Sequence, residues 1–390
     1  MLNAVILSMY TSQKGFLMSY TGNIVTPDSV FYGEVVTDGN IISGINKFSE
    51  IKSDADWVVA GFVDIHTHGL EYFSAEEADG VRGMTACAGK YGVCSFCPTL
   101  SCNTEAVLLR QVSDIRDIIR DDLPGAKVAG IHLEGPWLNP EHCGGMVPEF
   151  IRIATASEAD KYLAAADGTL KLLTIAPEVP GAYDVIPYFA RAGVTVSAGH
   201  TGLLPVDYEK AVASGIKQFC HLFDTYDLPE DHGGVRQPAI TDLALCDDRV
   251  MKEIIMDGLH VPPELVKLAR RAAGADHVIA ITDSLQGAGL KYGKFQEAGG
   301  WYIVREGDVA RRESDNVITG SSLTMNRAFF NMVTRFGFSM VEASKAASAN
   351  PAAAIGLGDV TGKLQVGFLA DITVLAPDLL TVKYCSAFGE

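Results

Sequence analysis

Two histidines one residue apart, His66 and His68, follow a short apolar segment and are the first residues whose types and spacing indicate chemistry. In an extended strand, residues i and i+2 point to the same face, so both imidazoles can reach one centre. Imidazole is the commonest metal ligand in proteins, and two on one face make half a metal site. By themselves, two histidines at this spacing are about as often structural, hydrogen-bonded residues at a strand end as they are metal ligands. The rest of the chain therefore decides between the two interpretations.

Four further residues of suitable type also follow apolar segments: Glu134, His200, His221 and Asp283. Imidazoles and carboxylates suit a divalent ion, and zinc, iron, cobalt and manganese all accept such ligands. Asp283 by itself fits a helix N-cap, where aspartate is common. In the company of the histidines and Glu134, it is a candidate general base and acid for hydrolysis.

The elements that must position these residues alternate along the middle of the chain. Apolar segments, most of them rich in β-branched residues, alternate with helix-like stretches about eight times. The apolar segments are 61–66, 92–97, 127–133, 170–176, 193–199, 216–222, 252–257 and 277–282. Apolar periodicity predicts helices over 104–120, 207–213, 263–273 and 322–336. This pattern predicts a parallel (β/α)8 TIM-type barrel, whose active site lies at the carboxyl ends of the strands.

The two ends of the chain have a different character. Residues 1–60 form short β segments, with a hairpin pattern around Asp38-Gly39-Asn40, and residues 359–390 are again rich in β segments. We therefore expect a small β-sandwich domain built from residues 1–60 and 359–390, beside a metal-dependent hydrolase barrel over 61–358.

Composition limits the function classes. The 390 residues are 48% hydrophobic and 20% charged, which describes a well-buried globular protein. A net charge of -17 argues against nucleic-acid binding and against docking on anionic membranes. The segment Met1–Tyr10 lacks the basic residues and the length of a signal peptide or membrane span, and the eight cysteines form no disulfide framework. We expect a cytoplasmic protein.

Several motifs resemble those of a known family. They lie at 61–69, 132–140, 197–201, 257–261, 282–283, 319–325, 350–356 and 362–374. Over nearly its whole length the chain resembles the amidohydrolase superfamily, and within it the N-acetylglucosamine-6-phosphate deacetylases. The resemblance implies a small-molecule substrate, an N-acetyl amino sugar 6-phosphate, from which the acetyl group is removed by amide hydrolysis.

The resemblance also implies roles for the metal ligands. Glu134, His200 and His221 would hold the principal divalent ion. His66 and His68 would hold a second ion, with Glu134 bridging the two. We expect one or two ions per chain, with zinc favoured and iron, cobalt or manganese as the other choices.

Substrate-binding residues follow from the same resemblance. Asp283 would be the general base and acid, and His260 would contact the substrate. Arg236 resembles the arginine that reaches the phosphate bound in a neighbouring subunit, which implies a homodimer. Met325 belongs to the 319–325 motif, and Asp224 and Thr225 lie in a loop that lines the sugar and phosphate pocket.

In two places the chain departs from this family pattern. Met146 stands where the family has a histidine that polarises the amide oxygen, and His142 lies nearby but out of register. Asp224-Thr225-Tyr226 replaces an Asn-Ala-Met sequence and is followed by extra residues 227–234, among them acidic ones. These changes favour deacetylation as the reaction more than a phosphorylated sugar as the substrate.

Two alternatives follow. The chain could be an N-acyl hydrolase for a different substrate, such as an unphosphorylated amino sugar or an N-acyl amino acid, with the same metal ligands. It could also be a catalytically silent barrel that serves as a binding protein, but silent relatives usually lose ligands first, and this chain keeps the full set.

Overall fold

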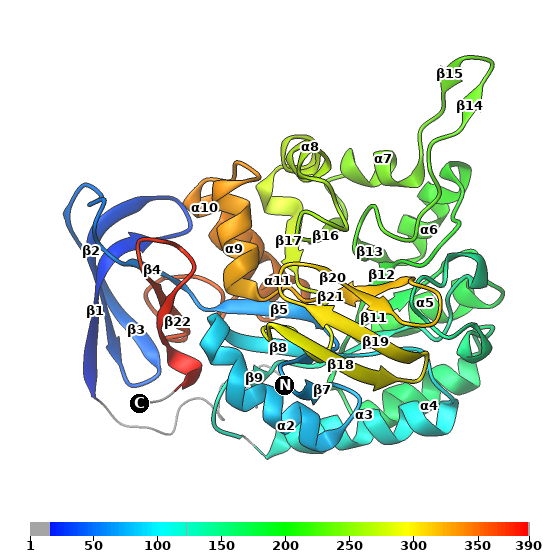
Figure 1. Ribbon diagram of the computed structural model, residues 1–390, viewed down its shortest axis with the longest axis horizontal. Coiled ribbons are helices and arrows are strands. Elements are labelled where there is room, and N and C mark those ends of the chain that lie inside the picture. Colours follow the sequence, from blue (N-terminus) through cyan, green and yellow to red (C-terminus); the bar gives the residue numbers. More distant parts are fainter. Residues whose placement is uncertain (1–15, 122, 389–390) are drawn as a thin grey trace.

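The computed structural model describes residues 16–121 and 123–388, and within them eight parallel strands form a barrel (Figure 1). In spatial order these strands are β5 (Phe62–Thr67), β8 (Val93–Leu100), β10 (Ile131–Glu134), β11 (Leu170–Ile175), β12 (Thr195–Ala198), β13 (Ile216–Phe219), β16 (Met251–Ile255) and β17 (Val278–Ile281). The predicted barrel is confirmed. The segment expected over 127–133 is interrupted, because a short strand β9 (Lys127–Val128) precedes β10 and pairs only with β8.

The barrel closes near the carboxyl ends of its first and last strands. The Asp283 amide donates to the His66 carbonyl oxygen at 2.9 Å, and the His68 amide donates to the Ser284 carbonyl oxygen at 2.8 Å. Because these hydrogen bonds join β5 to the end of β17, they bring residues distant in sequence to the same end of the barrel.

Helices surround the barrel and confirm the four predicted helical stretches. They are α2 (Ala78–Cys87), α3 (Glu105–Arg120), α4 (Ala156–Ala166), α5 (Ala182–Arg191), α6 (Tyr208–Ser214), α7 (Ile240–Leu245), α8 (Pro263–Ala273), α9 (Met325–Thr334), α10 (Met340–Ser344) and α11 (Asn350–Ala354). Thr104 caps α3, since its side chain accepts a hydrogen bond from the Val107 amide at 3.4 Å.

Strands from both ends of the chain lie together beside the barrel (Figure 1). They are β1 (Leu17–Val25), β2 (Val30–Asp38), β3 (Ile41–Ser49), β4 (Trp57–Ala60), β22 (Ile372–Leu375) and β23 (Val382–Cys385). The expected sandwich takes the form of one six-stranded sheet in the order β23-β22-β4-β1-β2-β3. The predicted hairpin joins β2 to β3, with Gly39 at a positive φ of 57°.

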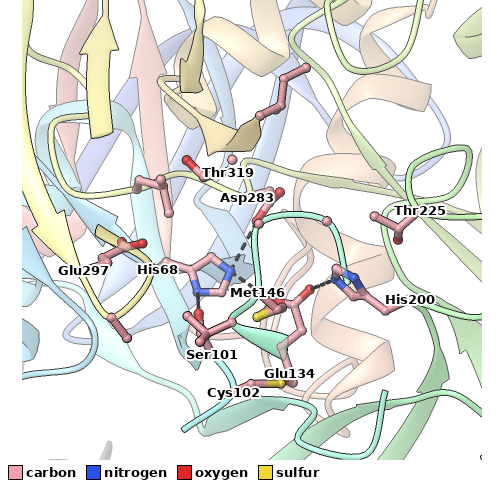
Figure 2. Close-up of a pocket in the computed structure, with 18 of the residues that line it drawn as sticks. His68, Ser101, Cys102, Glu134, Met146, His200, Thr225, Asp283, Glu297 and Thr319 are labelled. Atoms are coloured by element: carbon pink, nitrogen blue, oxygen red, sulfur yellow. Dashed lines mark hydrogen bonds and ion pairs between the residues drawn. The ribbon is translucent and has the colours of Figure 1, made fainter. Parts of the chain in front are cut away.

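A second sheet, which the sequence analysis did not predict, lies between β17 and α9. Its four antiparallel strands are β18 (Tyr292–Glu297), β19 (Gly300–Arg305), β20 (Val309–Arg312) and β21 (Ile318–Ser321). We call this the lid sheet, because its residues cover one side of the pocket described below (Figure 2). It has its own small apolar cluster around Leu285, Tyr302, Val304 and Ala310.

Among the described residues, no helix is both long and apolar enough to cross a membrane. The expectation for Met1–Tyr10 lies outside the described residues.

Candidate active site

The predicted metal ligands and the predicted proton-transfer residue lie together at the carboxyl ends of the barrel strands. They are His66 of β5, His68 directly after β5, Glu134 of β10, and His200, His221 and Asp283, which lie two residues beyond β12, β13 and β17, respectively. The last three have positive φ angles of 49°, 25° and 48°. Residues other than glycine seldom adopt this conformation, and such strained positions cluster at active sites.

Glu134 is the centre of the group, and all four histidines turn Nε2 towards it. Its Oε1 lies 3.0 Å from His221 Nε2, 3.1 Å from His200 Nε2 and 3.4 Å from His66 Nε2. Its Oε2 lies 3.2 Å from His68 Nε2. Figure 2 shows His68 and His200 reaching Glu134 from opposite sides. All five residues are buried.

Three of the rings have an oxygen within hydrogen-bond distance of Nδ1, a carbonyl oxygen for His200 and His221 and a hydroxyl that is able to accept for His68. The contacts are His68 Nδ1 with Ser101 Oγ at 3.1 Å, His200 Nδ1 with the His142 carbonyl oxygen at 2.9 Å, and His221 Nδ1 with the Asp224 carbonyl oxygen at 3.3 Å. A proton on Nδ1 leaves the Nε2 lone pair facing the centre, which is the tautomer that binds a metal.

The donor set fits a divalent metal ion. Ligand atoms of His66, His68 and Glu134 lie within 4.8 Å of one another. His66 Nε2 is buried and has no hydrogen-bond partner among the described residues, which is costly unless a ligand satisfies it. Imidazole nitrogens and carboxylate oxygens are the donors of hydrolytic metal centres.

The cluster is strongly polarised. Burial alone would raise the pKa of Glu134, but the neighbouring His66, His200 and His221 hold that pKa well below its usual value. Burial opposes the charged form of His221, yet Cys220 and Glu134 raise its pKa well above the ordinary value. Without a metal ion, protons on the histidines therefore balance the negative charge of Glu134. A divalent cation would replace those protons.

Asp283 lies beside His66 and His68. Its Oδ1 is 3.4 Å from His66 Nε2 and 3.3 Å from His68 Nε2. Although burial opposes ionisation, the charges of His66 and His68 lower the pKa of Asp283. A carboxylate in this position is ready to accept a proton.

His260, also predicted for the site, is held by a neighbouring acid. Its Nδ1 lies 2.6 Å from Asp257 Oδ2, while its Nε2 is buried without a hydrogen-bond partner among the described residues. Burial would lower the pKa of His260, but Asp257 raises it, with smaller contributions from Asp283 and Asp224. His260 therefore retains one free polar atom for a ligand.

An open pocket leads to the cluster from the lid side. Its lining residues are His68, Glu76, Ser101, Cys102, Glu134, Gly144, Gly145, Met146, Val147, His200, His221, Asp224, Thr225, Asp283, Leu285, Glu297, Ala298, Gly299, Ile318, Thr319 and Gly320. Within the described parts of the chain, no lysine or arginine lines it. Glu76 and Glu297, which the sequence analysis missed, add negative charge. Burial and the nearby Glu76 raise the pKa of Glu297 to about 7.

The structure brings Asp224 and Thr225 to the pocket and leaves four other predicted substrate-binding residues outside its lining, namely His142, Arg236, His260 and Met325. The His142 side chain turns away, with Nε2 3.5 Å from Asp227 Oδ1, and only its carbonyl oxygen serves the site. Met325 packs in the barrel core at the start of α9, with 1% of its surface exposed.

Arg236 lies on an arm that projects from the barrel (Figure 1). The arm is the hairpin of β14 (Asp231–His232) and β15 (Val235–Arg236). The Arg236 side chain is 62% exposed and forms an ion pair with Asp242 at 2.8 Å. In its own chain it does not line the pocket, because the inserted residues carry it outward.

Further residues support the site. Glu178, which follows the fourth apolar segment and is a supporting candidate from the sequence, accepts hydrogen bonds from the Thr201 hydroxyl and the Gly202 amide, and so fixes the loop that carries His200. Ser101 directly follows β8, so the rule that polar residues close barrel strands could have found it. Glu253, described below, had a clearer signal, since it is an acidic residue in the middle of an apolar strand.

Comparisons with known proteins identify the family of the chain. The model of the amidohydrolase family matches residues 57–388. The chain therefore belongs to the amidohydrolase family.

Its relatives within the family define a narrower group. An N-acetylglucosamine-6-phosphate deacetylase of Bacillus subtilis (strain 168) is 31% identical over 337 residues, which cover 84% of this chain and 83% of the relative. One from Danio rerio is 31% identical over 404 residues, covering 100% of this chain and 95% of the relative. A solved structure of a variant of the Mycobacterium smegmatis enzyme, in complex with N-acetyl-D-glucosamine-6-phosphate, has a TM-score of 0.85 and 29% identity and covers 95% of this chain and 97% of its own.

Proposed function

We propose that this chain is a metal-dependent hydrolase that removes the acetyl group from an N-acetyl amino sugar 6-phosphate. The observation that carries the proposal is the convergence of four imidazoles and two carboxylates in one pocket at the carboxyl end of the barrel. Relatives that align over most of the chain are deacetylases of this class.

The cluster offers two sets of metal ligands. We assign the principal ion to Glu134, His200 and His221, whose donor atoms lie within 3.2 Å of one another. His66 and His68 would hold a second ion, with Glu134 shared between the two sites. When bound, a divalent ion lowers the pKa of water and polarises a carbonyl group. We expect zinc, and iron, cobalt or manganese would accept the same donors.

Asp283 is the proton-transfer residue in this proposal. Its lowered pKa keeps it ionised at neutral pH, so it can take the proton of the attacking water. The same carboxyl then donates that proton to the nitrogen of the departing amine. Its place on the pocket wall beside His66 and His68 supports this double role.

The substrate contacts come from the rim. Asp224 and Thr225, which line the pocket, can hydrogen bond with sugar hydroxyls. His260 lies outside that lining, and we propose that its buried Nε2, which has no hydrogen-bond partner among the described residues, contacts an anionic group of the substrate. For the phosphate we propose Arg236 of a second copy, in a homodimer. Leu228 and Val235 on the projecting arm are 85% and 61% exposed, and such apolar side chains favour a protein contact.

One observation favours a second candidate. The pocket lining contains carboxylates and, among the described residues, no cationic side chain other than histidine. Unless another subunit supplies a positive charge, this lining suits an unphosphorylated amino sugar or an N-acyl amino acid. The same metal ligands and Asp283 would serve either substrate.

The test compares kcat/KM for N-acetylglucosamine with and without the 6-phosphate, for N-acetylgalactosamine 6-phosphate, and for N-acetyl amino acids. Arg236→Ala should lose phosphate preference selectively. Arg82→Ala is the matched control, because Arg82 is another exposed arginine paired with a carboxylate, that of Asp121. If the unphosphorylated sugar or an amino acid is the best substrate, the second candidate replaces the first.

We also propose a division of the chain. Residues 61–358 carry the chemistry, and residues 1–60 and 359–390 form a supporting β domain. We propose a cytoplasmic location, where sugar phosphates are found.

A further inference from the structure

Glu253 is a charged residue in the centre of the barrel that the proposed reaction does not use. It lies in the middle of β16 and is fully buried. An isolated buried carboxylate is strongly unfavourable, so its contacts must compensate for the lost hydration.

Fixed donors surround this carboxylate. Gln218 Nε2 donates to Oε1 at 2.6 Å, and the His221 amide points to Oε2 at 3.4 Å. The remaining neighbour of Oε2 is His66 Nδ1, also at 3.4 Å. Glu253 therefore contacts two residues of the metal cluster on the side away from Glu134, namely His221 through its backbone amide and His66 through its ring.

His66 differs in this respect from the other three imidazoles. His68, His200 and His221 each face a neutral oxygen at Nδ1, whereas His66 faces a carboxylate. A carboxylate is the stronger acceptor, so it holds the proton on Nδ1 and makes the opposite nitrogen a better metal ligand. The opposite nitrogen, Nε2, is the buried atom without a partner that faces Glu134 and Asp283.

We propose that Glu253 is a positioning residue for the second metal ion, because it fixes the ring and tautomer of His66. This inference rests on the proposed metal-dependent function. In this proposal, the affinity of the His66–His68 site for its ion depends on Glu253. The affinity of the Glu134–His200–His221 site does not.

A competing arrangement uses the same atoms. His66, Cys220 and Glu253 lie close enough to hold an ion themselves, with Cys220 Sγ 3.5 Å from His66 Nδ1. That ion would need the Nδ1 lone pair, which would leave a proton on Nε2 facing the main cluster. The two arrangements therefore require opposite tautomers of His66.

The decisive variant is Glu253→Gln. With Gln218 in its present orientation, the new amide oxygen accepts from Gln218 Nε2, so its NH2 group would face the His66 Nδ1–H and the His221 amide. Donor would meet donor, and His66 would shift its proton to Nε2. Ser101→Ala is the matched control, because it removes the neutral acceptor of His68 instead.

Metal binding is measured by titrating metal-free protein with zinc and by counting ions by mass spectrometry. For Glu253→Gln we expect the second ion to bind about 10–100-fold more weakly, with the first within a few-fold of wild type. Ser101→Ala should weaken the second ion less. Nitrogen NMR of 15N-histidine-labelled protein loaded with two zinc ions should show His66 protonated at Nδ1 and metal-bound at Nε2 in the wild type.

Three results would overturn the proposal. They are unchanged affinity for both ions in Glu253→Gln, equal loss of both ions together with a lower melting temperature, and loss of an ion in Cys220→Ser. If Glu253→Gln does not fold, Glu253→Asp decides, since it keeps the charge but withdraws it from His66 and should also weaken the second ion selectively. None of these measurements uses turnover, so a failed deacetylase assay would reject the proposed function without affecting this inference.

Discussion

The metal cluster and the pocket rim are built in different ways. Cluster residues lie at the ends of buried barrel strands, and their rings are held from behind by acceptors such as the carbonyl oxygens of His142 and Asp224. The rim consists of the lid sheet and of loops, and its residues Glu76 and Glu297 are partly exposed, although burial raises the pKa of both carboxyl groups. The cluster side chains are fixed both by one another and by the acceptors behind them, so they keep the geometry that catalysis needs. The rim side chains lack such supports and can move to fit a substrate.

The largest effect should come from breaking the cluster at its centre. His221→Ala, or His200→Ala, should empty the tighter metal site and lower kcat more than about 10⁴-fold, because activation of water and polarisation of the carbonyl are lost together. Metal content and kcat are measured on the same samples. A rim variant, Thr225→Ala, should keep its metal. Full occupancy in the histidine variants would show that the cluster is held together without metal.

The next effect separates proton transfer from metal binding. Asp283→Asn should keep the fold and the metal but lose roughly 10²–10⁴-fold in kcat, since an amide cannot act as the general base. Circular dichroism and metal content provide the controls. Activity within a few-fold of wild type would mean that Asp283 has a structural role only, and not that of a helix cap, because no helix in the described part of the chain begins there.

The same contrast explains what the sequence could predict. His66, His68, His200, His221 and Asp283 each follow an apolar segment, and the barrel brings such positions to one place, so local pattern was sufficient for the cluster and the fold. Rim residues come together only through the tertiary structure.

Strand β18 alternates between exposed and half-buried positions and has no fully buried apolar face, and this is why the lid sheet and Glu297 were missed. Arg236 and Met325 were expected near the substrate because of motif resemblance. The first lies on an inserted arm, and the second is the first residue of a buried helix face.

A third prediction concerns the two halves of the cluster. Replacing both His66 and His68 with alanine should lower the metal content by about one ion per chain. Activity should fall too, because Met146 lines the pocket without a hydrogen-bond donor for the amide oxygen, and loss of such a donor elsewhere costs roughly 10²–10³-fold. Unchanged metal content would mean that these histidines only support the site.

The smallest effect should arise at the rim, from Glu297. Its pKa is raised from 4.5 to about 7, first by burial and then by Glu76. The folded protein therefore binds this proton more tightly than the unfolded chain, so the protonated carboxyl favours folding at low pH. That contribution is lost as the pH rises from about 4.5 through 7.

Glu297→Gln removes this dependence, because glutamine stays neutral. We expect its melting temperature to match the wild type at pH 5 and to exceed it by roughly 1–2 °C at pH 8, with metal content unchanged. Glu306→Gln is the control, since Glu306 lies exposed in the turn after β19 of the same sheet. If the two variants show the same pH profile, Glu297 is not held in a desolvated position. Water then reaches the rim more freely than the burial of Glu297 in the structure indicates.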